Sequence, residues 1–351
     1  LARAAAARAA GLPEEQVTLY PMLGGGGYGR KLETEAIEQA AMMTAQVKRP
    51  VQLIWSRIEE TMQDGFRPPA AATVSATLGQ GGRITGWQTR IAAPATVAQA
   101  TARLAGKGDP EAEADPAMAD GAVPPYGIPA VAVDWLPADI PLRTGLSRAA
   151  AHGYTAFFTE SFIDELAREA GVEPLSFRMQ MLGGNTRLAQ CLATAGALGG
   201  WDGGGSGSRM GLAAHSAFGS HIAILVEAEF DALRRVQVGR AVAAVDCGRV
   251  INPTIVAQLI EGGILHGIAA ATGRPITFED GLPTARGFAD LALPRLADSP
   301  EVTVEIIPSQ EPPGGVTELG VPPVAPAIAN ALFAATGRRL RSLPLVPESR
   351  R

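Results

Sequence analysis

A cluster of glycines near the N-terminus offers the first chemistry in the sequence. Gly24, Gly26 and Gly29 follow the spacing G-x-G-x-x-G, and glycine lets backbone N–H groups approach a ligand with no Cβ in between. The helix expected after the loop would add partial positive charge at its N-terminus. The loop is therefore suited to a dinucleotide, a phosphate, a thiolate or a metal-oxo group, unless it is only a tight turn from strand to helix.

The dinucleotide interpretation needs an acidic residue about 20 positions after the loop, at the end of the next strand. Lys48 and Arg49 occupy those positions, and Glu59 and Glu60 come too late. A β-hairpin is predicted next, where a Rossmann domain would alternate strands with helices. A nicotinamide dehydrogenase built on Gly24–Gly29 is thus an alternative that the surrounding sequence does not favour.

Glu318 is a candidate carboxylate for acid–base chemistry. It lies in PPGGVTELGVPP, a turn bracketed by glycine and proline before a predicted helix. A general base must come within hydrogen-bond distance of the proton it removes, and a well-ordered turn can place a carboxylate in this way. Taken alone, a glutamate in such a turn is more often a solvated surface residue.

The composition excludes several classes of protein. The net charge is −5 and no basic stripe is present, so no nucleic-acid partner is expected. The two cysteines, Cys191 and Cys247, are too few for an iron–sulfur cluster or a four-cysteine zinc site, and we expect both thiols to be free and buried. No uncharged apolar run reaches about 18 residues, so no membrane span is predicted.

These residues must be positioned by elements of both types, and the length suggests two domains. Hydrophobic periodicity and capping residues predict helices over 1–10, 30–47, 252–271 and 322–337. Alternating or β-branched runs predict strands over 17–23, 49–57, 221–230, 236–247 and 301–309, and a hairpin over 70–93. A loop is expected over 102–125 and a glycine-rich linker over 198–211. The sum is an α+β fold with mixed sheets and packed helices.

The clearest amphipathic pattern covers residues 155–182. Phe158, Phe162, Leu166 and Ala170 recur at helical spacing and should share one face. Gly171 is expected to end this helix, and Pro174 to begin a second, short one.

Five segments, in order along the chain, resemble the molybdenum-binding subunit of the xanthine dehydrogenase/aldehyde oxidase family. GGGGYGRK resembles the family's Gly-Gly-Gly-Phe-Gly motif. The other four are PVQLIWSRIEETMQDGFRPPA, TESFIDELAREAGVEPLSFRMQML, VDCGRVINPTIVAQLIEGGILHGI and GGVTELGVPPVAPAIANALFAATGRRLRSLPL. The pattern is most similar to the isoquinoline 1-oxidoreductase β-subunit-like branch, which includes membrane-bound bacterial aldehyde dehydrogenases.

The resemblance implies molybdenum-cofactor-binding domains of the xanthine dehydrogenase type. Residues 1–182 would be the remainder of a first molybdopterin-binding domain, and residues 183–351 a second one. Subunits of the family are about twice this long, so the chain resembles a C-terminal half. Another chain would then carry the N-terminal half.

The implied cofactor is molybdopterin with molybdenum, in bacteria usually in the cytosine dinucleotide form. The metal is held by the pterin dithiolene, with no ligand from the protein. By position in the motif, backbone at Gly26, Gly27, Tyr28 and Gly29 would lie against the metal's oxo group, with Tyr28 in place of the usual phenylalanine. Gln258 would bind the pterin, because its amide offers both a donor and an acceptor.

By the same resemblance, Glu318 would be the general base at a Mo–OH group, in the oxidation of an aldehyde or N-heterocycle with water as the oxygen source. Arg148, twelve residues before Glu160, would stabilise negative charge that develops on the substrate, with Arg143 as the fallback. Two departures from the family pattern, Thr317 in place of glycine and Ala149–Ala151 in place of a glycine-containing run, support an alternative. The chain would then be a catalytically decayed scaffold half-subunit.

The resemblance also implies partners. Electrons would pass to a small subunit with two [2Fe–2S] clusters, and in this branch often onward to cytochrome c. The expected location is periplasmic or membrane-associated through partners, with a cytoplasmic location as the alternative. The substrate would be a small molecule, an aldehyde or an N-heterocycle.

Overall fold

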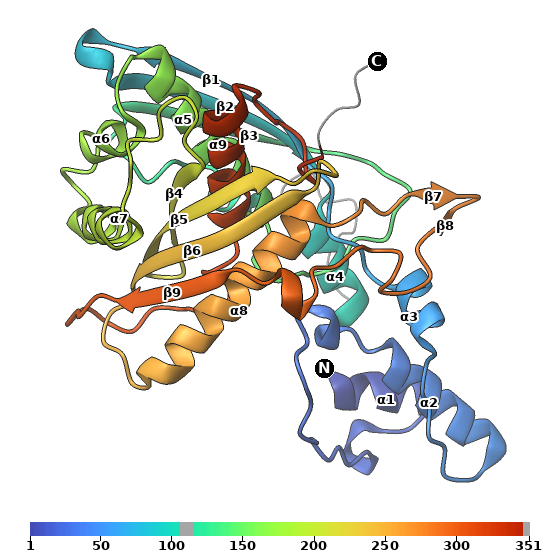
Figure 1. The fold of residues 1–351 in the computed structure, drawn as a ribbon. Coiled ribbons are helices and arrows are strands. Elements are labelled where there is room, and N and C mark those ends of the chain that lie inside the picture. The colour runs from blue at the N-terminus through green and yellow to red at the C-terminus, as the bar shows by residue number, and fades with distance from the viewer. Residues whose placement is uncertain (106–114, 347–351) are drawn as a thin grey trace.

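The computed structural model describes residues 1–105 and 115–346, which form two main sheets with a helix between them (Figure 1). The first sheet has the order β1-β2-β3, with strands Ala71–Leu78, Ile84–Ala93 and Ala130–Pro137. The second has the order β4-β5-β6-β9, with strands Met210–Ala217, Ser220–Phe230, Val236–Asp246 and Glu301–Ile306. Two short antiparallel strands, β7 (Phe278–Glu279) and β8 (Leu282–Pro283), form a separate hairpin. The first sheet has one antiparallel and one parallel pair, and the second has two antiparallel pairs and one parallel pair, so the mixed α+β prediction is confirmed.

Helices cover both faces of the four-stranded sheet. Successive side chains of a strand point to opposite faces, and here Ala213 and Ile224 pack toward α8 (Pro253–Thr272) and α9 (Val324–Thr336). Their neighbours Ala214 and Ala223 belong to the cluster of α7 (Thr186–Gly199) on the other face. Burial from both sides explains why these strands read as continuous apolar runs.

Helix α9 lies directly on strand β4. A Cβ at Gly211 would come within 2.1 Å of the carbonyl oxygen of Ala327. Only glycine at this strand position permits that approach, and it brings the turn before α9, which contains Glu318, close to the sheet.

Helix α5 (His152–Glu169) fills the space between the two sheets. Ile163 packs with Ile84 and Trp87 of the first sheet, whereas Phe157 belongs to the cluster of β4, β5 and α9. The predicted apolar face packs on the core, with Leu166 buried and Phe158, Phe162 and Ala170 half-buried against it. The opposite side of the helix is buried as well. A helix between two layers needs apolar residues on both sides. As predicted, Gly171 follows the helix with φ 64°, and Pro174 begins α6 (Pro174–Met179).

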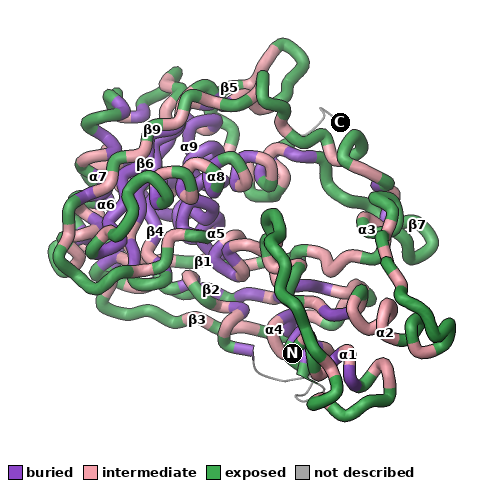
Figure 2. Tube along the Cα trace, turned by 90° about the horizontal axis from the view of Figure 1, so that it is seen from below, coloured by how far each residue is buried: buried purple, intermediate pink, exposed green. Residues whose placement is uncertain are grey.

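The residues before β1 form a more exposed layer, as Figure 2 shows around α1, α2 and α3. Helix α1 (Ala2–Ala10) ends at Gly11 in the left-handed conformation, as predicted. Helix α2 (Glu35–Val47) begins five residues later than predicted, because a 3₁₀ turn occupies Arg30–Leu32. Helix α3 (Arg57–Gln63) follows, with Ser56 accepting a hydrogen bond from the N–H of Glu59.

Two predictions of strands, over 17–23 and 49–57, are wrong. Residues 18–26 and 49–55 make no backbone–backbone hydrogen bond within the described part of the chain, and α3 takes up the end of the second segment. A strand needs a neighbour that supplies its ladder partners, and neither segment has one here.

The predicted loop over 102–125 is only partly a loop. Its first four residues end α4 (Thr96–Ala105), and residues 106–114 lie outside the described residues. Helix α7 and strands β3 and β4 occupy segments in which no element is predicted, whereas the hairpin β1–β2, the pair β5–β6, β9, α8 and α9 lie where expected. Cys191 and Cys247 are free and buried, as predicted.

Helix α8 is long and apolar enough to cross a membrane by length and composition. The sequence analysis predicts no membrane span here, because Glu261 interrupts the uncharged apolar run. One side of the helix, including Ile260 and Ile264, is buried in the cluster that also contains α9 and the sheet. Packing in the core accounts for the apolar composition.

A buried ion pair connects α5, α6 and β4. The Nε atom of Arg178 lies 3.0 Å from Oε2 of Glu160, and both side chains are fully buried. The Glu160 carboxylate also accepts hydrogen bonds from the Tyr126 hydroxyl (2.6 Å) and the Ala214 N–H (2.9 Å). Burial and the Glu160 charge raise the pKa of Tyr126, which keeps that hydroxyl a donor.

We expect Arg178→Met to lower the free energy of unfolding by about 3–5 kcal/mol, because it leaves a buried carboxylate without its cation. Denaturant unfolding followed by circular dichroism measures this. The control is Arg209→Met, which removes the exposed pair with Glu229 and should cost less than about 1 kcal/mol. Equal losses in the two variants would contradict the structural role of the Glu160–Arg178 pair.

Candidate active site

The main chain at Arg148 and Ala149 joins the two regions that the sequence singles out. The N–H of Arg148 donates to the carbonyl of Tyr28 at 3.0 Å. The next N–H, that of Ala149, donates to Oε2 of Glu318 at 2.9 Å. The glycine loop and the predicted base are therefore both held by two consecutive residues, although they lie near opposite ends of the chain.

The backbone at this junction is unusual. Tyr28, Ala149 and Ala150 have φ values of 49°, 73° and 41°, in the left-handed region that costs a non-glycine residue on the order of 1–2 kcal/mol. Gly29 has φ 99°, and a Cβ there would lie 2.1 Å from the carbonyl oxygen of Leu146. Such conformations persist where the surroundings impose them, most often at functional sites.

The guanidinium of Arg148 binds main-chain carbonyls. Nε donates to the carbonyl oxygen of Thr317 at 2.7 Å, Nη1 to that of Gly262 at 3.2 Å and Nη2 to that of Leu259 at 3.1 Å. The side chain thus fixes the turn before Glu318 against α8. Burial lowers the pKa of Arg148, and the charges of Tyr28 and Glu318 oppose that shift. Contact between Arg148 and a substrate stays a prediction.

The glycine loop presents backbone and an aromatic ring. The ring of Tyr28 stacks on His266 of α8, with 5.4 Å between centroids, and its side chain is 60% exposed. A Cβ at Gly26 would lie 2.7 Å from that ring. Within the described residues, the N–H groups of residues 26–29 have no backbone partner, whereas the carbonyls of Gly27, Tyr28 and Gly29 accept backbone hydrogen bonds.

Two polar side chains near the junction have no hydrogen-bond partner among the described residues. Gln258 is exposed on α8, one turn before Gly262, and Ser147 has a buried hydroxyl next to Arg148. A buried hydroxyl without a partner costs free energy unless a ligand or water satisfies it. The loop, the amide and the hydroxyl fit a polar ligand bound between the glycine loop and α8.

Sequence reasoning missed Arg67. Its Nη2 donates to the carbonyl of Arg148 at 3.0 Å, so it holds the junction from the other side. Arg67 is exposed to solvent along the wall of a half-open cavity of about 930 Å³. Burial lowers the pKa of Arg67, and the Glu318 charge opposes that shift. The signal in the sequence was the Arg-Pro-Pro that the resemblance covers.

The cavity beside Arg67 is mainly apolar. Its aromatic lining comes from α5, from β7 and from the segment before β1: Phe66, Tyr154, Phe157, Phe158, Phe162 and Phe278. Val321, three residues after Glu318, also lines it. The cavity thus lies next to the turn that contains the candidate base.

A buried pair of histidines lies at the start of α5. Nδ1 of His152 lies 2.9 Å from Nε2 of His215 on β4. Burial lowers the pKa of His215 to about 3 and, with opposition from Asp120 and Glu318, also lowers that of His152. Both rings are therefore neutral at pH 7 and share one N–H.

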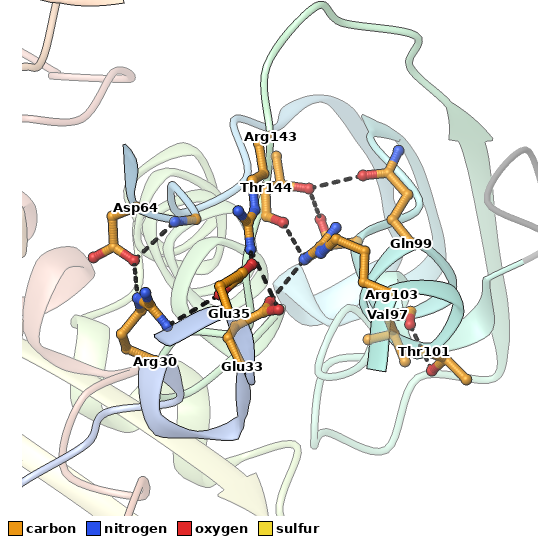
Figure 3. Close-up of polar contacts among 12 residues, drawn as sticks. Arg30, Glu33, Glu35, Asp64, Val97, Gln99, Thr101, Arg103, Arg143 and Thr144 are labelled. Carbon is orange, nitrogen blue, oxygen red and sulfur yellow. Dashed lines mark hydrogen bonds and ion pairs between the residues drawn. The ribbon is translucent and has the colours of Figure 1, made fainter. Parts of the chain in front are cut away.

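The fallback arginine, Arg143, lies in a different cluster (Figure 3). It pairs with Glu35 and, at 3.3 Å, with Glu33. Arg103 binds Glu33 at 2.8 Å and the carbonyl of Thr144 at 2.9 Å. These ion pairs bind Arg143 to Glu33 and Glu35, so its side chain stabilises the segment that follows the glycine loop.

Two domain models match the chain. Residues 1–182 and residues 200–300 each match a molybdopterin cofactor-binding domain, and the first match alone covers more than half of the chain. The chain belongs to the molybdenum-binding subunits of the xanthine dehydrogenase/aldehyde oxidase family. The family resemblance is confirmed, whereas the proposed domain boundary after residue 182 stays a prediction.

Relatives in this family include two bacterial proteins. The chain is 30% identical to the beta subunit of isoquinoline 1-oxidoreductase from Brevundimonas diminuta, over 96% of this chain and 44% of that protein. It is 28% identical to membrane-bound aldehyde dehydrogenase [pyrroloquinoline-quinone] of Gluconacetobacter polyoxogenes, over 96% and 47%. The chain thus spans about half the length of these relatives.

Solved structures share the fold. Quinoline 2-oxidoreductase from Pseudomonas putida 86 matches with a TM-score of 0.82 and 12% identity, over 98% of this chain and 69% of that one. Aldehyde oxidoreductase from Desulfovibrio gigas matches with a TM-score of 0.77 and 15% identity, over 95% and 54%. At these identities the likeness concerns the fold alone.

The histidine pair should make stability depend on pH. The pKa of folded His215 is below the unfolded value of about 6.5, so protons favour the unfolded state. The stability contributed by this residue is complete above about pH 6.5 and falls as the pH decreases toward 3. We expect His215→Asn to reduce the fall in unfolding free energy between pH 7 and 5 by roughly 1–2 kcal/mol. Denaturant titrations at both pH values measure this, and identical pH dependences would contradict it.

Proposed function

We propose that this chain is the C-terminal half of the large molybdenum subunit of an enzyme that oxidises an aldehyde or an N-heterocycle, with water as the source of oxygen. The observation that carries the proposal is the junction at Arg148 and Ala149, which places the glycine loop next to Glu318. Membership of the family and the names of the relatives support this class of reaction.

The proposed cofactor is molybdopterin with molybdenum, in the cytosine dinucleotide form. Its fit rests on the N–H groups of residues 26–29, the amide of Gln258 and the hydroxyl of Ser147, none of which has a hydrogen-bond partner among the residues that the structure describes. When bound, the cofactor supplies oxygen transfer to the substrate and accepts two electrons. The chain contributes hydrogen-bond donors around it, and the pterin brings the metal's ligands.

Glu318 acts as the general base in this proposal. Its Oε2 is fixed by the N–H of Ala149, whereas its Oε1 has no hydrogen-bond partner among the residues that the structure describes. One carboxylate oxygen is thus anchored and the other is available to accept a proton from the attacking oxygen. A half-buried position limits competition from bulk water.

The arginines act as positioning residues. Arg148 holds the carbonyl of Thr317, directly before Glu318, and Arg67 holds the carbonyl of Arg148. Thr317 keeps its side chain exposed and contributes through its main chain, so the change from glycine is tolerated.

The apolar cavity suits an aromatic or other apolar substrate. Its volume of about 930 Å³ and its phenylalanine lining resemble those of sites that bury most of a small organic ligand. Entry through this cavity would bring a substrate past Arg67 toward Val321 and the Glu318 turn.

The enzyme requires partners in this proposal. A second chain supplies the N-terminal half of the subunit, and a small subunit with two [2Fe–2S] clusters accepts the electrons and passes them to cytochrome c. Two relatives are named as subunits, one as a subunit of an isoquinoline 1-oxidoreductase and the other as a subunit of a nicotinate dehydrogenase. These names support an assembly of several chains. A periplasmic or membrane-associated location, reached through the partners, completes the proposal, with a cytoplasmic location as the alternative.

A catalytically decayed scaffold is the second candidate, suggested by Thr317 and Ala149–Ala151. Ala149 and Ala150 adopt the left-handed conformation that glycine usually takes, and Ala149 still donates to Glu318. The retained contact favours the active enzyme over the scaffold.

We expect Glu318→Gln in the assembled enzyme to reduce turnover by about 10²–10⁴-fold, because an amide cannot serve as the base. Molybdenum content, measured by elemental analysis, should be unchanged. Glu311→Gln, on the exposed stretch before the same turn, is the control and should keep full turnover.

Two outcomes would count against the enzyme. Unchanged turnover in Glu318→Gln would leave the scaffold as the better account. An assembled complex without molybdenum would remove the proposed cofactor and with it the reaction.

A further inference from the structure

The main chain before Glu318 rests on a tight turn between two strands. Phe218 and Gly219 connect β4 to β5 with φ values of 56° and 77°, as in a type I′ hairpin turn. The carbonyl of Phe218 accepts a hydrogen bond from the N–H of Gly315 at 2.8 Å. A Cβ at Gly314 would lie 2.7 Å from the carbonyl oxygen of Gly219. The hairpin turn therefore supports the segment that leads to Glu318.

The carboxylate of Glu318 is held by a different element. Its partner is the N–H of Ala149, three residues before His152, the first residue of α5. Glu318 is thus supported at two places, its carboxylate at the start of α5 and the main chain before it at the β4–β5 turn. Any shift between these two supports would move the carboxylate relative to its own main chain.

His152 and His215 connect the two supports. His152 begins α5, and His215 lies on β4 three residues before Phe218. Nδ1 of His152 lies 2.9 Å from Nε2 of His215. The His152 ring also contacts the ring of Phe218 edge-on, with 4.9 Å between centroids. One side chain at the start of α5 therefore binds both the strand and the turn that follows it.

The histidine pair is enclosed by protein. His152 and His215 are 9% and 2% exposed. A Cβ at Gly121 would lie 2.5 Å from Nδ1 of His152 and 3.0 Å from Cε1 of His215. The charged groups that act on His152 are Asp120, next to Gly121, and Glu318, while His215 senses the His152 ring. Loss of either ring nitrogen would leave the other buried without its partner, which is costly.

We propose that the hydrogen bond between His152 and His215 positions Glu318 for its role as the base, by fixing the start of α5 to the β4–β5 turn. This inference rests on the proposed function, because it assigns the pair to the same site. The two histidines are positioning residues, which act on the carboxylate through Ala149 and on the turn through Phe218.

Two replacements of similar shape test the hydrogen bond from α5 in the assembled enzyme. Asparagine places an amide nitrogen where the ring of His152 has Nδ1, whereas leucine has the same branching without polar atoms. We expect His152→Leu to lower kcat by about 10–100-fold, because a small displacement of a catalytic group costs this much, and His152→Asn to keep kcat within about threefold. The described residues that line the apolar cavity include neither histidine, so KM should stay within about threefold in both variants.

The corresponding replacements on β4 give a readout that does not depend on the folding of His152→Leu. Glutamine places an amide nitrogen where the ring of His215 has Nε2, whereas methionine has a similar length and only a weak acceptor. We expect His215→Met to lower kcat by about 10–100-fold and His215→Gln to keep it within about threefold. Equal kcat values in these two variants would overturn the role of the hydrogen bond.

A double-mutant cycle separates positioning from a general structural role. If His152 acts through Glu318, its replacement should cost little once the base is absent. We expect His152→Leu to lower kcat by less than about threefold in a Glu318→Gln background. Losses that multiply in the double variant would show that the histidine acts independently of the base.

Ile163→Ala is the control for destabilisation of α5. Ile163 is fully buried on the same helix, in the cluster that contains Trp87, and its truncation should lower the midpoint of thermal unfolding at least as far as His152→Leu does. Assayed below that midpoint, its kcat should stay within about threefold of wild type. An equal loss of kcat in Ile163→Ala and His152→Leu would overturn the inference, because destabilisation alone would then explain both.

The outcomes separate this inference from the proposed function. Unchanged kcat in His152→Leu, together with the expected loss in Glu318→Gln, overturns the positioning role and leaves the proposed function standing. Full turnover in Glu318→Gln rejects the base, and with it both proposals. A loss of kcat in His152→Leu that is recovered in His152→Asn and disappears in the Glu318→Gln background supports both.

Discussion

Two consecutive main-chain N–H groups, those of Arg148 and Ala149, connect the glycine loop to Glu318. Both partners lie on turns, which have little rigidity of their own. Their relative position therefore depends on the segment between Ser147 and Ala150, whose backbone is held in a costly conformation. Arg67 and Arg148 fix that segment through carbonyl oxygens, so the strain is retained by contacts to three other parts of the chain.

The rest of the fold makes this junction rigid. The segment leads directly into α5, which is packed between the two sheets and is tied to β4 by the buried carboxylate of Glu160. On the other side, the turn before α9 approaches α8 closely because Gly263 meets Gly320. Glu318 therefore lies on a short turn between well-packed elements, which is the arrangement that a positioned base requires.

The exposed layer around α1 and α2 contrasts with this core. Its segments before and after the helices have strand-like sequences but lack ladder partners among the described residues. The ion pairs of Arg143 and Arg103 with Glu33 anchor only the exit of the glycine loop. The layer around α1 and α2 is thus less firmly packed than the core around α5 and the four-stranded sheet.

The sequence by itself determined the elements that local patterns specify. Helices α8 and α9 have caps and apolar periodicity, and the hairpin β1–β2 has a glycine turn, so each was predictable from adjacent residues. The motif resemblance identified the family and the candidate residues at the loop and at Glu318. It could not determine that Ala149, rather than a glycine, would donate to Glu318.

Only the tertiary structure decided which groups meet. The guanidinium of Arg148 is satisfied by carbonyls of Leu259, Gly262 and Thr317, and the His152–His215 pair joins a helix to a strand. These contacts join residues far apart in the chain, and no local periodicity encodes them. The same reason explains the two missing strands, since a strand is defined by its neighbour and not by its own residues.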